Sequence, residues 1–190
     1  MSVPQFNPRS LVLLLIIVIV AALRFAAFTG MGPLTVFTPV GAMALFGGTY
    51  FKGNLKPLLF PLLTLFISDV VLAFTVLSAH RVGLLYAGWF WTYLAFALMA
   101  IAGKLIIKEV TIKNILIGVV VATCIHWLIS DIGGCLAEQH FSMTVYVQRL
   151  ITAIPYEWMF LAGTAIYSTI MFGAFELLQH RFGSLKTARS

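Results

Sequence analysis

The sequence predicts an all-α integral membrane protein with six transmembrane helices. Three features lead to this expectation: the composition, the spacing of the apolar blocks and the placement of the basic residues. Hydrophobic residues make up 61% of the 190-residue chain and charged residues only 9%, more apolar surface than one soluble core can bury. A membrane-spanning helix needs roughly 20 apolar residues, so six would use about 120 and leave only short loops and tails. We therefore expect a single transmembrane domain over residues 1–190.

Six apolar blocks follow one another along the chain. Their approximate limits are 11–28, 36–51, 57–77, 82–107, 115–130 and 150–178. The links between them are polar, charged or rich in glycine, and the longest is expected between the fifth and sixth blocks. Prolines inside the blocks predict kinks and not ends, because membrane helices tolerate proline when neighbours satisfy the freed carbonyls. The pairs Gly47-Gly48 and Gly133-Gly134 are typical of close helix contacts or turns.

The basic residues predict that both ends of the chain lie in the cytoplasm. With the N-terminus inside, nine of the twelve Lys and Arg residues fall on the cytoplasmic side and three outside, namely Arg24, Arg81 and Arg149. Cytoplasmic loops of membrane proteins carry such an excess of Lys and Arg. We therefore expect the protein in the cell inner membrane. An alternative for residues 1–28 is a signal peptide, although the apolar run is long and lacks a clean cleavage site. The scattered basic residues form no face that would bind nucleic acid.

Five ionisable residues from four predicted helices fall at one depth, towards the outer face. They are Arg24, Asp69, His126, Asp131 and Glu157. Asp69, for example, lies about 12 residues into the third block, about 18 Å from its cytoplasmic end. A charge within a span is costly unless it is paired or hydrated, so such residues usually face the bundle interior or a wet cavity. We predict an outward-facing pocket here; internal ion pairs or side chains that snorkel to the interface remain the structural alternative.

Aromatic residues cluster at the same outer level. Trp89 lies at the start of the fourth predicted helix, where it could join an interfacial belt or line a pocket. Cys124 and Cys135 have neither metal-site nor disulfide-framework spacing. The sequence contains no recognisable catalytic motif and no glycine-rich phosphate loop, so we expect no enzyme, no resident cofactor and no metal.

One stretch of the chain resembles a known family. The motif Phe37-Thr38-Pro39 is followed by the run Gly41 to Gly48 and then by Ser68-Asp69. This pattern resembles small six-helix bacterial membrane proteins related to the substrate-binding S-components of energy-coupling-factor (ECF) vitamin transporters. The resemblance implies an S-component-like bundle, with an outward-facing pocket capped by the loops after helices one, three and five. It also implies a partner, an ECF energising module made of ATPases and a transmembrane coupling subunit.

The solitary cobalamin-binding members of that family suggest further site residues. Asp69, Tyr86 and Arg149 match, by position, an Asp, a Tyr and an Arg that surround the ligand, and Thr38 lies in the motif itself. The chain departs from the family at the loop after helix three, where His80 stands and no cysteine is available to bind cobalt. An imidazole could replace the thiolate if the substrate is a corrinoid, because neutral histidine binds transition metals; a solvated loop histidine is the simpler interpretation.

Three functions are compatible with these observations. The first is uptake of a vitamin-like molecule, cobalamin or another, by a substrate-binding membrane protein. The second is a non-transporting structural or assembly subunit whose polar residues fix helix register. The third is a small membrane enzyme that acts on a lipid or isoprenoid and uses Asp69, His126 and Glu157 as acid and base groups.

Overall fold

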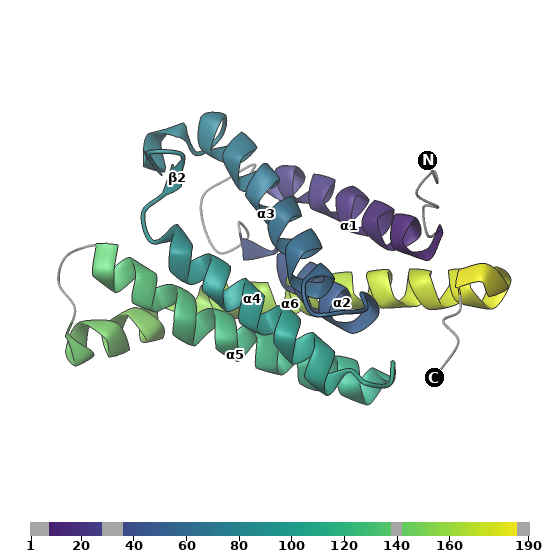
Figure 1. Cartoon of the computed structure of the whole chain (residues 1–190). Coiled ribbons are helices and arrows are strands. Elements are labelled where there is room, and N and C mark those ends of the chain that lie inside the picture. The colour runs from purple at the N-terminus through teal and green to yellow at the C-terminus, as the bar shows by residue number, and fades with distance from the viewer. Residues whose placement is uncertain (1–7, 28–35, 138–141, 186–190) are drawn as a thin grey trace.

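The computed structural model describes residues 8–27, 36–137 and 142–185, and within them it is all-helical apart from one small hairpin (Figure 1). The expectation of six α-helices is confirmed. They are α1 (Pro8–Ala27), α2 (Val40–Tyr50), α3 (Lys56–Phe74), α4 (Trp89–Ile106), α5 (Ile112–Ala137) and α6 (Met143–Arg181). The short 3-10 helices are η2 (Ser78–His80) and η3 (Gly183–Leu185), and the two-residue strands β1 (Arg81–Val82) and β2 (Leu85–Tyr86) pair antiparallel.

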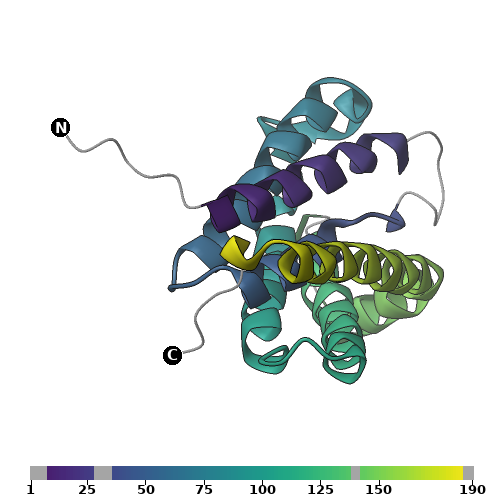
Figure 2. The same cartoon turned by 90° about the vertical axis from the view of Figure 1, so that its right-hand side faces the viewer.

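Helix α2 lies at the centre of the bundle. Almost all of its residues are buried, and it packs against α3, α4, α5 and α6 as well as α1. The long helix α5 lies between α4 and α6 and packs along both (Figure 1), and α1 lies on the side of α3 and α2 (Figure 2). The start of α4, the end of α5 and the start of α6 meet at the left-hand end in Figure 1. We call this the hairpin end, because β1 and β2 lie there too.

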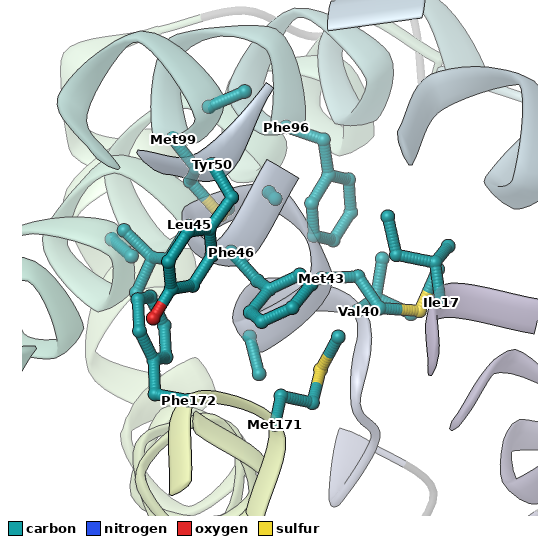
Figure 3. Close-up of a cluster of buried hydrophobic side chains, with 14 of the residues drawn as sticks. Ile17, Val40, Met43, Leu45, Phe46, Tyr50, Phe96, Met99, Met171 and Phe172 are labelled. Carbon is teal, nitrogen blue, oxygen red and sulfur yellow. The ribbon is translucent and has the colours of Figure 1, made fainter. Parts of the chain in front are cut away.

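Aromatic rings fill the core between α2 and α6. The rings of Phe46 and Tyr50 on α2 contact Phe172, with ring centroids 5.4 Å away in each case (Figure 3). Phe175, one turn further along α6, lies 4.6 Å from the Tyr50 ring. Aromatic pairs at these separations stabilise a core beyond the area that they bury. The apolar faces of α2 and α6 therefore hold the far end of the bundle together.

Glycine pairs permit the closest helix contacts, as the sequence predicts. A methyl group built on Gly48 would overlap the carbonyl oxygen of Ala100 on α4, and one on Gly47 would overlap the ring of Pro61 on α3. Helix α3 continues through Pro61, so this proline is accommodated inside a helix, as expected. Small residues at crossing points let helix backbones approach each other, and Gly47-Gly48 does so on two faces of α2.

In the described part of the chain four helices are long and apolar enough to cross a membrane, namely α3, α4, α5 and α6. The expectation that every helix has this length is wrong for α2. Its 11 residues rise only about 16 Å, roughly half of a bilayer's hydrocarbon thickness. The block 36–51 is apolar throughout because α2 is surrounded by protein, and not because it is a full-length span.

Several helix limits also differ from the apolar blocks. Residues 82–88, expected to open the fourth helix, instead form the hairpin and a turn, and α4 begins at Trp89 after Gly88, whose φ is +79°. The expected long link between blocks 115–130 and 150–178 is mostly helical, because α5 continues to Ala137 and α6 begins at Met143. Ser142 caps α6 by accepting a hydrogen bond from the backbone of Val145 (3.2 Å).

Polar contacts hold the ends of α1, α2 and α6 together. The guanidinium of Arg9 donates to the carbonyl of Leu185 (2.9 Å) and lies 5.4 Å from the centroid of the Phe175 ring. The hydroxyl of Tyr50 donates to Oε1 of Glu176 (2.6 Å). These bonds join segments from opposite ends of the chain, far from the hairpin end.

We expect Tyr50→Phe to lower the free energy of unfolding by about 1–3 kcal/mol, because it removes a donor from a half-buried carboxylate. Unfolding in mixed detergent micelles, followed by circular dichroism, measures the change. The matched control is Tyr156→Phe, since Tyr156 is exposed and should leave stability almost unchanged. Equal effects for the two variants would contradict a stabilising role for the bond between Tyr50 and Glu176.

Candidate functional site

A polar cavity of about 570 Å³ lies between the last turns of α5 and the first turns of α6, at the hairpin end of the bundle. Four of the sequence-predicted residues line it. The lining residues are Val36, His126, Ser130, Asp131, Arg149, Thr152, Ala153, Tyr156 and Glu157. We call this space the polar cavity.

The innermost feature of the polar cavity is a carboxylate paired with an imidazole. Oε1 of Glu157 lies 2.7 Å from Nδ1 of His126. The His126 ring is stacked on Phe160, with centroids 4.1 Å apart and an interplanar angle of 13°, and Phe96 of α4 lies on it at 5.9 Å. Because Phe160 follows Glu157 by three residues, both lie on the same face of α6. The imidazole of His126 therefore contacts two residues on the same face of α6, the carboxylate of Glu157 and the ring of Phe160.

The second oxygen of Glu157 has no hydrogen-bond partner among the described residues. This atom, Oε2, is buried, and the whole side chain is only 10% exposed. Oδ2 of Asp131 is likewise buried without a partner among those residues. Buried polar atoms in proteins are nearly always hydrogen-bonded, so each exception calls for an explanation. Both residues line the polar cavity, so their carboxylates are candidate acceptors for the donor groups of a ligand.

Groups of both charges share the polar cavity. Asp131 lies within electrostatic range of Glu157, His126 and Arg149. The guanidinium of Arg149 lies over Gly134 of α5, where an added methyl carbon would be 2.5 Å from Nη2. The lining holds two carboxylates, one guanidinium and one imidazole, and the two carboxylate oxygens without a partner among the described residues favour a ligand with donors.

The sequence around Asp131 builds this end of the site. Gly133 allows the turn before α4 to lie close to the backbone of α5, since a methyl group on Gly133 would lie 3.0 Å from the carbonyl oxygen of Gly88. Gly134, its neighbour, leaves room for Arg149. The prediction that this glycine pair marks close helix contacts is confirmed. Two hydrogen bonds then fix α5 to α6, from Trp127 to the Leu150 carbonyl (3.0 Å) and from Tyr146 to the Leu128 carbonyl (2.7 Å).

Asp69 belongs to a second polar pair, between α3 and α4. It is 3% exposed, and its Oδ2 accepts a hydrogen bond from the hydroxyl of Tyr93 (2.9 Å). Tyr93 precedes Phe96 by three residues on α4, and Phe96 contacts His126. The two polar pairs are therefore neighbours across one turn of α4, but Asp69 is not among the residues that line the polar cavity.

Tyr93→Phe should lower the free energy of unfolding by about 1.5–3 kcal/mol, because a buried carboxylate would lose a charge-assisted hydrogen bond. Thermal unfolding in detergent measures the loss. In the background Asp69→Asn the same change should cost clearly less, since the charge is gone. An equal cost in both backgrounds would show that the hydroxyl of Tyr93 does not stabilise the protein through Asp69.

The other predicted site residues lie outside the polar cavity or outside the described side chains. Thr38 is buried beside Gly163 of α6. Tyr86 is half-buried on β2 and not in α4, and Trp89 is 45% exposed and in edge contact with Tyr93. The side chains of Arg24, in α1, and His80, in η2, lie outside the described part of the structure.

Sequence reasoning missed Phe160, Phe96 and Gly134 as parts of this site. Phe160 could have been found, because its spacing from Glu157 places both on one helix face. Phe96 carries no such signal, since its role depends on a contact between helices. For Gly134 the sequence indicated a close contact but not that its partner is Arg149. Among the described residues no group of three His, Cys, Asp or Glu side chains has an arrangement that could hold a metal ion. The site combines hydrogen-bond acceptors, one guanidinium and flat rings, which suits the recognition of a polar organic molecule.

Comparison with known proteins gives a family without an assigned role. No curated protein and no solved structure matches the chain. The model of the family of unknown function DUF6580 matches residues 4–187, which is nearly the whole sequence. This chain belongs to DUF6580.

Proposed function

We propose that this chain is a multi-pass protein of the cytoplasmic membrane that binds a vitamin-like small molecule at its outer end for uptake. The observation that carries the proposal is the carboxylate of Glu157, a residue that lines a cavity of about 570 Å³ and whose buried Oε2 has no partner among the described residues. Leaving a buried acceptor unsatisfied costs about 1–3 kcal/mol. A bound molecule that donates to this oxygen offsets that cost.

The membrane setting follows from the long apolar helices and the basic residues. Four helices have the length and composition of membrane spans, α1 adds a further apolar helix, and α2 lies inside the bundle. The positive-inside rule supports an orientation with the polar cavity on the outer side and both chain ends in the cytoplasm. An ionisable cluster within a membrane domain is a binding-site hypothesis by default, because such residues face a pathway or a cavity.

The uptake role and its partner come from the resemblance to S-components. That resemblance supports a bundle that captures its substrate outside and releases it inside with the help of an ECF energising module. The size of the polar cavity lies in the range for drug-sized ligands. This favours a vitamin of one or two rings over a whole corrinoid, which is much larger, so His80 as a cobalt ligand is the less favoured version of the proposal.

The test is a titration of the purified protein in lipid nanodiscs with thiamin, riboflavin, biotin and a cobalamin, followed by calorimetry. We expect saturable binding of one of the small vitamins at one molecule per chain. Heat changes that do not saturate for any of the four vitamins, nor for a small amine with an apolar tail, would overturn the proposal. The second arm is growth of a deletion strain on limiting vitamin, complemented by wild-type protein or by variants of equal abundance.

The two other functions predict different outcomes of the same experiments. A structural subunit would bind none of the vitamins, and Glu157→Gln would affect stability without changing growth at equal protein level. An enzyme that uses Asp69, His126 and Glu157 together needs these groups around one point. Asp69 instead accepts a hydrogen bond from Tyr93 and does not line the polar cavity that holds the other two residues, which favours binding over three-group catalysis.

A further inference from the structure

The polar cavity is next to an apolar groove on the same pair of helices. The groove has a volume of about 500 Å³ and is lined by Val120, Thr123, Cys124, Trp127, Ile154, Glu157, Trp158 and Leu161. Glu157 belongs to both linings. Its carboxylate therefore stands at the boundary between a space with charged groups and a space with hydrocarbon walls.

From this continuity we propose that the ligand is an amphiphile, with an amine or ammonium head in the polar cavity and a single short hydrocarbon tail in the groove. The inference rests on the proposed function and narrows its substrate class. It adds one requirement, that the polar and apolar parts belong to the same molecule. The head group of the ligand then contacts Glu157, and its tail extends from that point into the groove.

The head is assigned from the acceptors. Glu157 Oε2 and Asp131 Oδ2 are buried and have no donor among the described residues. A primary ammonium carries three donors and a positive charge, which suits a cavity lined by two carboxylates. Charge-assisted hydrogen bonds of this kind are shorter and stronger than neutral ones. An anionic head would instead place like charges beside the two carboxylates.

The tail is assigned from the shape and chemistry of the groove. On α5 its lining runs from Val120 to Trp127, a rise of about 10 Å, and on α6 from Ile154 to Leu161. Trp158 is exposed on its wall, and Trp127 is held in place by its hydrogen bond to the Leu150 carbonyl. A tail in this groove would lie beside both indole rings, and its length is limited to the short groove.

The two tryptophans of the groove provide the test. In nanodiscs of phosphatidylcholine, the variant Trp89→Phe/Trp91→Phe keeps only Trp127 and Trp158 of the four tryptophans in the chain. A short alkylammonium with a brominated tail should quench their fluorescence saturably. The alkylsulfonate with the same brominated tail should quench only in proportion to its partitioning into the bilayer. Glu157→Gln should weaken the saturable quenching at least tenfold, whereas Glu176→Gln, at the other end of α6, should not change it.

A second variant separates this inference from the proposed function. Cys124→Trp places a large ring in the groove from a position on α5 that does not itself line the polar cavity. This variant should abolish the saturable quenching. The measurement uses the background Trp89→Phe/Trp91→Phe/Trp158→Phe, in which Trp127 is the remaining native tryptophan. If a vitamin without a tail binds the wild type and Cys124→Trp equally well, the amphiphile inference is wrong while the proposed function stands. Equal, unsaturable quenching by both bromo-amphiphiles would show that the groove holds ordinary lipid chains only and would also overturn the inference.

Discussion

Gly48→Ala should destabilise the protein by about 3 kcal/mol, a large effect for the addition of one methyl group. The added carbon would overlap the carbonyl oxygen of Ala100 and crowd the backbone of Lys104. Backbone atoms of α4 cannot turn aside as a flexible side chain can, so α2 and α4 must separate. Since α2 lies at the centre of the bundle, this separation disturbs packing on several sides.

The matched control is Gly173→Ala on α6. A methyl group there meets nothing within 4 Å, and alanine is a better helix former than glycine by roughly 1 kcal/mol. Gly173→Ala should therefore be neutral or stabilising, and the two variants should differ in sign. Unfolding in mixed micelles, with both variants measured against wild type, checks this. A Gly48→Ala variant as stable as Gly173→Ala would show that α2 and α4 do not pack as closely as described.

Glu157→Gln should weaken binding of the ligand about a hundredfold. The substitution removes the charge and replaces one acceptor oxygen with a donor, so the ligand's donors lose their partner. Hydrogen bonds to charged groups contribute about 1.5–3 kcal/mol, and about 2.7 kcal/mol corresponds to a factor of one hundred in Kd. Calorimetry of the variant in nanodiscs, with the ligand that binds the wild type, measures the change.

Glu176→Gln is the control for this second prediction. Glu176 lies on the same helix and accepts a hydrogen bond from Tyr50, but it is distant from the polar cavity. Its substitution should lower stability slightly and leave Kd unchanged. If both variants weaken binding to the same extent, the effect comes from a general loss of folded protein, and Glu157 has no special role.

The depth of the site could be predicted from the sequence, because helical rise fixes how far along a span each residue lies. His126 and Glu157 are 31 residues apart, yet the antiparallel arrangement of α5 and α6 brings them within 2.7 Å. Depth does not fix the direction in which a side chain points around its helix. Asp69 shows this, since it turns towards Tyr93 and not into the polar cavity.

The helix limits at the hairpin end could not be predicted from hydropathy. Ser130 and Asp131 end the apolar block, and the glycine pair that follows weakens a helix by roughly 1 kcal/mol per residue relative to alanine. The helix nevertheless continues to Ala137, because Gly133 and Gly134 permit contacts with Gly88 and Arg149 that larger residues would prevent. Tertiary packing thus overrides local preference at the residues that build the site.

The short length of α2 could not be predicted from the sequence for a related reason. An apolar run predicts burial but does not tell lipid from protein. Gly47 and Gly48 indicate close neighbours, and those neighbours surround an 11-residue helix on all sides. The hairpin before α4 could not be predicted either, since Leu84 and Leu85 continue an apolar pattern through its turn.

The most direct test of the account is a high-resolution structure of the purified protein in nanodiscs with its ligand bound. Ligand density should lie between α5 and α6, with donor atoms about 2.7–3.2 Å from Glu157 Oε2 and Asp131 Oδ2. Ligand density beside Asp69 and Tyr93 instead, with the space between His126 and Arg149 closed by side chains, would contradict it.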